Sequence, residues 1–148
     1  MKVLFVAGFG PIVRDGDAAG QLYRQALNLP GWKEEEGGYW HTESVPGVRA
    51  FGLWPLEHAA ESCFGSPRWP DDVPIPQGWI EFDVEDVAEA TEDLRAAGYR
   101  LLVENREEPW GQIVSRFLSP EGLLVGVTVT PWMREPGLAG DREPSPPT

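Results

Sequence analysis

The stretch from Trp79 to Leu102 constrains the fold more than any other, because its hydrophobic period changes midway. Residues 80–84 alternate apolar and acidic side chains, which is typical of a strand with one buried face. Apolar side chains then recur at helical spacing over residues 87–94. Asp86 can cap the free amides of the first turn, and Gly98 can end the helix in the left-handed conformation. The stretch therefore predicts a strand, a capped helix and a second strand, in that order.

The same order is repeated in the first half of the chain. Val13-Arg-Asp15 matches Val84-Glu-Asp86 at an offset of 71 positions, and an apolar strand from Val3 to Phe9 precedes it. Three extended segments follow the helix in each half. Two sheets of this kind, each covered by a helix on one face, can enclose a cavity between their open faces. The helix after Asp15 should have one apolar face, formed by Ala19, Leu22, Tyr23, Ala26 and Leu27.

These patterns predict one domain over residues 1–131, followed by a disordered tail over residues 132–148 that is rich in proline, glycine and charge. Residues 55–77 hold five prolines, so we expect little regular structure there apart from a short helix near residues 56–61. The domain then divides into module one at residues 1–55, a linker at residues 56–77 and module two at residues 78–131.

Composition argues against several classes of function. The chain carries 24 acidic and 12 basic residues, and its net charge of −12 would repel a nucleic-acid backbone. No apolar run is long enough to span a membrane. Cys63 is the only cysteine, which rules out an internal disulfide and favours a reducing, cytoplasmic location. The seven tryptophans suit either a ligand-binding surface or the packing of the core.

The ordered set of these features, together with the segments Pro109–Gln112 and Phe117–Leu124, resembles the vicinal oxygen chelate superfamily. That superfamily includes glyoxalase I, bleomycin-resistance proteins, fosfomycin-resistance enzymes and extradiol dioxygenases. The resemblance covers roughly residues 2–131. It implies an α+β fold, in which two βαβββ modules in tandem form a cup-shaped mixed sheet around a cavity. It also implies a homodimer, and leaves open whether the modules pair within one chain or between chains.

Metal-dependent members of this superfamily bind one divalent ion with His and Glu side chains. The matching positions of this sequence are Gly8, Gly52, Trp79 and Gly126, and none of these side chains can ligate a metal ion. We therefore predict that the chain uses no metal and no other cofactor.

Two histidines and the cysteine lie outside those positions. His41 and His58 could ligate a metal but lack companions at a suitable spacing, so a surface or hydrogen-bonding role is favoured for each. Cys63 has no basic group obviously placed to activate it, so we expect an inert thiol.

Strand alternation indicates which side chains face the predicted cavity. Ile80, Phe82 and Val84 should pack under the helix, so their neighbours on the same strand should face the other way. Indole rings bind planar or cationic groups, and carboxylates supply a counter-charge. The alternative is that these carboxylates lie on a solvated edge and the tryptophans fill the gap between the modules. The candidate ligand-binding residues are Trp54, Trp79, Glu81, Asp83, Trp110 and Thr128.

Three functions remain compatible with this sequence. The first is a metal-independent small-molecule binding protein of the glyoxalase/bleomycin-resistance type, with a cationic or aromatic ligand. The second is a glyoxalase-like lyase or isomerase, or a dioxygenase, that holds a divalent metal with ligands other than the usual ones. The third is a protein-interaction module without a small ligand. No catalytic residue can be assigned: Glu81 or Asp83 could act as a general base, with Gln112 or Arg116 as a partner of undecided orientation.

Overall fold

Eight strands form one continuous mixed sheet in the computed structural model, which describes residues 1–134. The strand order is β2-β3-β4-β1-β5-β8-β7-β6. The first four strands are β1 (Val3–Val13), β2 (Lys33–Glu35), β3 (Tyr39–Thr42) and β4 (Phe51–Pro55). The last four are β5 (Gly78–Val84), β6 (Leu101–Glu107), β7 (Ile113–Leu118) and β8 (Leu124–Val129).

The two halves of the sheet have the same connectivity. β1 pairs in parallel with β4, and β5 pairs in parallel with β8, while the remaining neighbours within each half are antiparallel. Antiparallel pairing of β1 with β5 joins the halves, and Gly8 lies opposite Glu81 in that ladder. The predicted pair of βαβββ modules is therefore confirmed, and in this structure the modules pair edge to edge within one chain.

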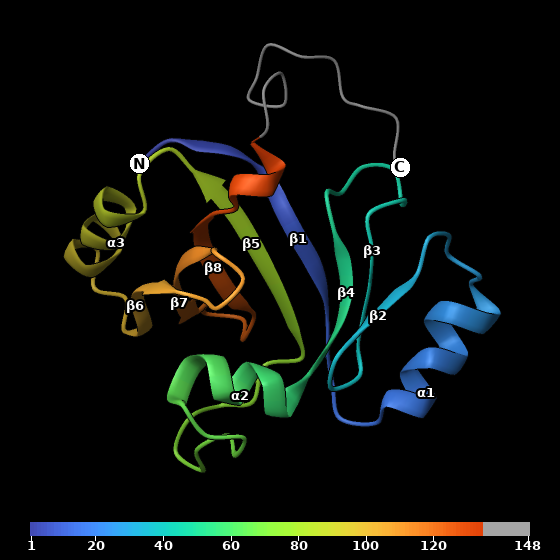
Figure 1. Cartoon of the computed structure of the whole chain (residues 1–148). Helices are drawn as coiled ribbons and strands as arrows, with labels where there is room; N and C mark the ends of the chain where they lie inside the picture. The colour runs from blue at the N-terminus through green and yellow to red at the C-terminus, as the bar shows by residue number, and fades with distance from the viewer. Residues whose placement is uncertain (135–148) are drawn as a thin grey trace.

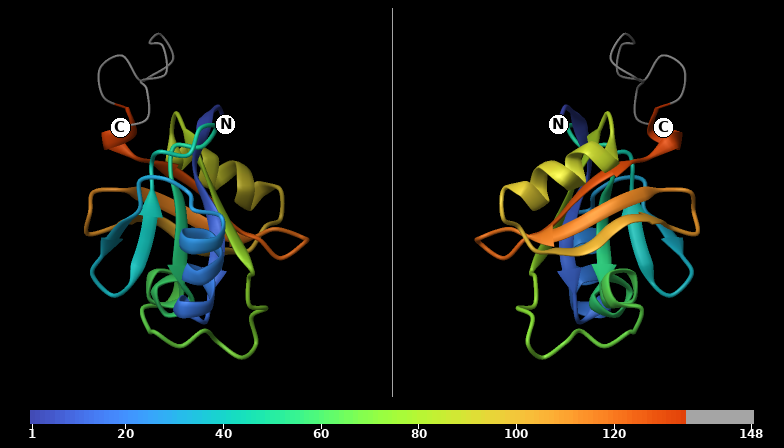
Figure 2. Two further views of the ribbon diagram at one scale, coloured as in Figure 1. Left: turned by 90° about the vertical axis from the view of Figure 1, so that its right-hand side faces the viewer. Right: turned by 90° about the vertical axis from the view of Figure 1, so that its left-hand side faces the viewer.

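Helices flank the sheet and close one of its ends. α1 (Gly16–Gly20) continues as the π-helix η1 (Gln21–Ala26), and the others are α2 (Leu56–Phe64), α3 (Val87–Ala96) and the 3₁₀ helix η2 (Pro131–Met133). In Figure 1, α3 and α1 lie on opposite flanks of the sheet and α2 lies at its lower end. Each side view of Figure 2 has one flanking helix in front of the strands, α1 in the left view and α3 in the right.

The second module follows the sequence prediction closely. The Asp86 side chain accepts a hydrogen bond of 3.0 Å from the backbone amide of Glu89, which caps α3. Gly98 has a φ of +93° and follows the last turn, as a left-handed terminator should. Val87 and Leu94 pack in one buried cluster with Val127 of β8. The apolar stripe of α3 therefore covers the outer face of the second half of the sheet.

The first helix departs from the prediction. Asp15 caps it as expected, accepting a hydrogen bond of 3.0 Å from the amide of Ala18. However, two residues of the predicted apolar face are exposed: Leu22 is 48% and Leu27 is 54% accessible. The amide of Leu27 donates to the carbonyl of Leu22, five residues back, because the chain has widened into a π-helix. Side chains at three- and four-residue spacing no longer form one stripe there, so the prediction of a single apolar face was wrong.

The linker is more ordered than its prolines suggest. The short helix expected near residues 56–61 is found, but α2 extends to Phe64. Ala59 and Cys63 are buried in the same core cluster as Trp69. The indole of Trp69 donates a hydrogen bond of 3.0 Å to the carbonyl of Val73, which fixes the proline-rich loop against that core. The linker is thus part of the packed domain.

The end of the described chain is also structured. Pro131–Met133 form η2, so the chain continues as a helical turn past the expected start of the tail at residue 132. The rest of the predicted tail, residues 135–148, lies outside the described residues. Within residues 1–134, no helix is both long enough and apolar enough to cross a bilayer.

Candidate functional site

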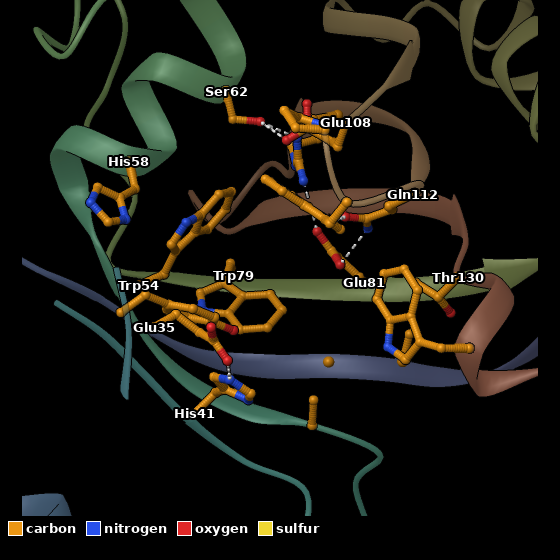
Figure 3. Close-up of a pocket in the computed structure, with 18 of the residues that line it drawn as sticks. Glu35, His41, Trp54, His58, Ser62, Trp79, Glu81, Glu108, Gln112 and Thr130 are labelled. Atoms are coloured by element: carbon orange, nitrogen blue, oxygen red, sulfur yellow. Dashed lines mark hydrogen bonds and ion pairs between the residues drawn. The ribbon is translucent and has the colours of Figure 1, made fainter. Parts of the chain in front are cut away.

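A cavity of about 910 Å³ lies within the cup formed by the sheet, and both modules contribute to its lining. Strands β1 to β4 and helix α2 supply one side, and β5, β6, β7, the turn after β6 and η2 supply the other. Figure 3 shows side chains from these elements directed into the same space. Four of the seven tryptophans of the chain line this cavity: Trp54, Trp79, Trp110 and Trp132.

The four indoles occupy different depths. Trp79 is only 5% exposed and donates a hydrogen bond of 3.3 Å to the carbonyl of Gly52. Trp54 packs edge-on against it, with ring centroids 5.8 Å apart (Figure 3). Trp110 and Trp132 are 54% and 40% exposed, and so lie where a ligand could reach them. Trp79 and Trp54 therefore form a fixed aromatic part of the cavity wall, and Trp110 and Trp132 are two accessible aromatic side chains.

A local turn positions Trp110. The amide of Glu108 donates to the carbonyl of Gln112 at 2.7 Å, and the amide of Gly111 donates back to the carbonyl of Glu108 at 2.9 Å. Gly111 has a φ of +93°, a conformation that glycine adopts without strain. The indole of Trp110 then donates to the side-chain oxygen of Gln112 at 2.8 Å. This turn holds Trp110 over the polar base of the cavity.

The polar base is a buried network centred on Arg116. Its guanidinium donates to Glu81 at 3.1 Å and to the hydroxyl of Ser62 at 2.5 Å. Ser62 in turn donates to Glu108 at 3.0 Å, and the Nε of Arg106 lies 2.7 Å from the other oxygen of Glu108. The side chains of Arg116 and Glu108 are 2% and 1% exposed. Buried charges of this kind persist only when each has a partner, and here two guanidinium groups neutralise two carboxylates.

Glu81 is held on both of its oxygens. Besides Arg116, it accepts a hydrogen bond of 3.0 Å from the amide nitrogen of Gln112, which also donates to Thr128 at 2.8 Å. A carboxylate whose charge is balanced in this way is poorly placed to serve as an isolated counter-charge or as a free general base. Its role here is to tie β5 to β7 beneath the cavity.

Acidic side chains surround the mouth on the side of the β2–β3 hairpin and α2. Glu35 lies 3.0 Å from the Nε2 of His41 (Figure 3). The His41 ring stacks on Tyr39, with ring centroids 5.1 Å apart. We call this group of side chains the acidic rim; its members are Glu35, Glu36, Glu43 and Glu61. Within residues 1–134, Glu36, Glu43 and Glu61 form no ion pair with a basic side chain.

Tyr39 extends from the rim toward the base of the cavity. Burial, followed by the nearby charge of Glu81, raises the pKa of its hydroxyl well above the ordinary value, so the phenol stays neutral. A β-carbon placed on Gly52 would lie 2.5 Å from this hydroxyl oxygen. Tyr39 therefore fills the space that a side chain at position 52 would need.

Two of the four positions that match the family's metal ligands, Gly8 and Trp79, line this cavity, and the four positions together do not fit a metal ion. A β-carbon on Gly8 would lie 2.6 Å from the indole of Trp79, and one on Gly126 would lie 3.0 Å from Glu81. The glycines therefore leave no open space at these positions, because neighbouring side chains occupy it. Within the described chain, no group of three or more His, Cys, Asp or Glu side chains is arranged to hold a metal.

The structure separates the predicted site residues into two sets. Trp54, Trp79, Glu81 and Trp110 line the cavity. Asp83 and Thr128 do not, although strand alternation points them toward the same face, because both are 0% exposed. Gln112 covers Thr128, and the residues around η2 cover Asp83. Their assignment as lining residues was wrong, since alternation predicts the face of a strand but not what covers it.

Other lining residues escaped the sequence prediction. Trp132 and Met133 fell in the expected tail, and Glu108 lies in a turn with no periodicity. Arg116 could have been oriented from its strand, because Phe117 packs under α3 and its neighbour must face the cavity. His41 and His58 both line the cavity.

The thiol of Cys63 lies outside this lining. Burial raises the pKa of Cys63 to about 11, which keeps it protonated at neutral pH. This agrees with the prediction of an inert side chain.

Comparison with known proteins identifies related sequences and folds. The family model described as the Glyoxalase/Bleomycin resistance protein/Dioxygenase superfamily matches residues 9–127. No curated protein matches the sequence. A superfamily member of that description from Vibrio splendidus 12B01 is 13% identical, covers 84% of this chain and 97% of its own, and has a TM-score of 0.55.

Two further solved structures have a similar fold. The 2,3-dioxygenase LapB from Pseudomonas sp. KL28 is 15% identical, with a TM-score of 0.54; the match covers 87% of this chain and 41% of LapB. A Legionella pneumophila protein described as NAD-dependent benzaldehyde dehydrogenase is 12% identical, with a TM-score of 0.53, over 82% of this chain and 96% of the other. At these identities the likeness is one of fold alone.

Proposed function

This chain belongs to the Glyoxalase/Bleomycin resistance protein/Dioxygenase superfamily, and we propose that within it the protein binds a cationic aromatic small molecule without a metal ion. The observation that carries the proposal is the cavity of about 910 Å³ with four tryptophans in its lining. Cavities of several hundred cubic ångströms suit small organic ligands. Indole faces attract planar and cationic groups more strongly than other side chains do.

The distribution of charge supports a cationic ligand. Six carboxylates and two guanidinium groups line the cavity. Arg116 and Arg106 balance Glu81 and Glu108 at the base, which leaves the acidic rim as the uncompensated charge. The chain as a whole carries a net charge of −12, which would attract cations toward the mouth. We infer that the ligand's cation lies at the rim and its aromatic part lies deeper, against the indoles.

The residues at the family's ligand positions support metal independence. Gly8, Gly52 and Gly126 have no donor atom in a side chain, and their neighbours fill the space beside them. Glu81, the carboxylate nearest those positions in the β1–β5 and β5–β8 ladders, already bonds Arg116 and Gln112. Metal analysis of protein purified without chelators tests this part, and a stoichiometric divalent metal would contradict it.

Three naphthalene probes of similar size and different charge test the ligand class by isothermal titration calorimetry. They are 1-naphthylmethylammonium, the neutral 1-naphthylmethanol and the anionic 1-naphthoate. We expect the cation to bind most tightly, because only it gains both the indole contacts and the attraction of the rim. Equal affinity for all three probes, or a preference for the anion, would refute the proposal.

Substitution of Trp54 tests whether the indoles form the site. Trp54→Ala should weaken binding of the cationic probe by about 1–3 kcal/mol, because it removes an aromatic face beside the buried Trp79. Trp40→Ala is the matched control: Trp40 lies on β3 outside the cavity lining, with the Arg24 guanidinium 3.9 Å from its ring. Similar losses in both variants would mean that the cavity is not the binding site.

A further inference from the structure

Residues 130–134 cross one end of the cavity and form part of its wall. Thr130 follows β8, Pro131–Met133 make the single turn of η2, and Arg134 ends the segment. In Figure 1 this segment lies beyond the end of β8, at the top of the sheet. Thr130, Trp132 and Met133 all line the cavity. We call residues 130–134 the strap.

A single carboxylate holds both ends of the strap. Asp83 of β5 accepts hydrogen bonds from the backbone amide of Thr130 at 3.2 Å and from its hydroxyl at 2.6 Å. The Nε of Arg134 donates to the other oxygen of Asp83 at 2.5 Å, and a second guanidinium nitrogen donates to the carbonyl of Val84. Between these two anchors the strap presents Trp132, 40% exposed, to the cavity.

The burial of Asp83 makes this arrangement more than a surface contact. Its side chain is 0% exposed, and Thr130 is 2% exposed. A buried carboxylate is tolerated only when hydrogen bonds and an opposite charge replace its water, and the strap supplies both. Burial is also the main reason that the pKa of Asp83 is raised, and the contacts with Thr130 and Arg134 act against that rise. The carboxylate and the strap therefore depend on each other.

We propose that Asp83 is a positioning residue: it anchors the strap so that Trp132 and Met133 form one wall of the cavity, and it thereby sets the affinity for the ligand. Asp83 touches no ligand itself. The part that concerns affinity rests on the proposed function, whereas the anchoring of the strap does not.

Asp83→Asn tests the anchoring without any ligand. The amide has the shape of the carboxylate but no charge, and its nitrogen faces donors from Thr130 or Arg134. The amides of Met133 and Arg134 donate to the carbonyls of Thr130 and Pro131. We expect hydrogen exchange of these two amides to accelerate at least about tenfold, while exchange in β5 and β8 stays near that of the wild type. Unchanged exchange in the strap would overturn the proposal.

A double-mutant cycle tests the effect on affinity, with 1-naphthylmethylammonium as the probe. Trp132→Ala alone should weaken binding about 3- to 30-fold. Asp83→Asn should weaken it to a similar extent, and the double variant should bind no worse than Trp132→Ala, because both changes remove the same wall. Losses that multiply in the double variant would overturn the positioning role.

Two further variants keep the test decisive. Arg134→Gln breaks the anchor from the strap side, at a side chain that is 19% exposed, and should reproduce the faster exchange if Asp83→Asn fails to fold. Thr91→Val is the matched control. Thr91 lies on α3 and is as buried as Asp83, but its hydroxyl bonds Ser115 and the carbonyl of Val87 and does not contact the strap. It should change neither strap exchange nor affinity. If the wild type binds no probe, the proposed function fails, and the exchange experiment still decides whether Asp83 anchors the strap.

Discussion

Replacing Gly8 with alanine should destabilise the protein, because Trp79 already occupies the space that the new methyl group needs. The added β-carbon would lie 2.6 Å from Cζ3 and 2.7 Å from Cη2 of the Trp79 ring. Favourable contacts between carbon atoms lie near ~3.5–4.0 Å, so the ring would have to move by about 1 Å. Trp79 is 5% exposed, bonded to the carbonyl of Gly52 and packed against Trp54, which leaves it little freedom to move.

The expected magnitude follows from two opposing effects. Overpacking a buried site costs about 1–3 kcal/mol. Gly8 does not have a positive φ, so alanine would also restrict the unfolded chain. That restriction raises the free energy of unfolding by about 0.4–1 kcal/mol. The net loss in free energy of unfolding should be roughly 0–2.6 kcal/mol, with a midpoint of about 1.3 kcal/mol. For a chain of this length the midpoint corresponds to a fall in Tm of about 3–5 °C.

Urea denaturation of a small set of variants can refute this reasoning. Gly16→Ala is the matched control, since a β-carbon there meets nothing within 4 Å, and its stability should equal or exceed that of the wild type. In a Trp79→Phe background, which lacks the ring atoms that clash, the cost of Gly8→Ala should disappear. The claim that the indole fills the former ligand position fails if alanine at position 8 is as harmless as at position 16. It also fails if the cost is the same in both backgrounds.

Two further predictions concern buried groups. Arg116→Ala should lower the free energy of unfolding by about 3–5 kcal/mol in chemical denaturation, because it leaves Glu81 without its cation and Glu108 with Arg106 alone; a loss below about 1 kcal/mol would contradict the network described here. Cys63 has a pKa raised to about 11, so only about 0.1% is thiolate at pH 8. A thiol reagent at pH 8 should therefore modify Cys63 only after unfolding, and rapid reaction of the folded protein would contradict its burial.

The parts of the fold that could be predicted are those that depend on residues close together in the sequence. The strand–helix–strand unit of module two has its caps at Asp86 and Gly98 as expected, because capping bonds and backbone conformation act within one or two turns. The first helix shows the limit of the same reasoning. Asp15 caps it, yet the π-helix that follows leaves Leu22 and Leu27 exposed. Spacing alone does not reveal a change of helix type.

The sequence predicted part of the candidate site correctly, from strand alternation and from the repeat of the two modules. Trp54, Trp79, Glu81 and Trp110 do line the cavity, since strand alternation and the module repeat indicate which side chains share a face. Asp83 shares that face but lies beneath the strap, which is contributed by residues 47 positions later in the sequence. No local pattern predicts that the strap, near the end of the domain, covers Asp83 and leaves Glu81 in the lining of the cavity.

The sequence by itself determined that three glycines and an indole stand where the family's metal ligands would be, because the donor atoms of a side chain depend only on its identity. Only the tertiary structure decided which carboxylates carry uncompensated charge. Glu81 meets Arg116 across 35 residues of sequence, whereas Glu36 and Glu61 on the acidic rim meet no basic side chain within residues 1–134. Pairing of this kind depends on how distant segments pack, and that packing is set by the whole core rather than by any one stretch of the chain.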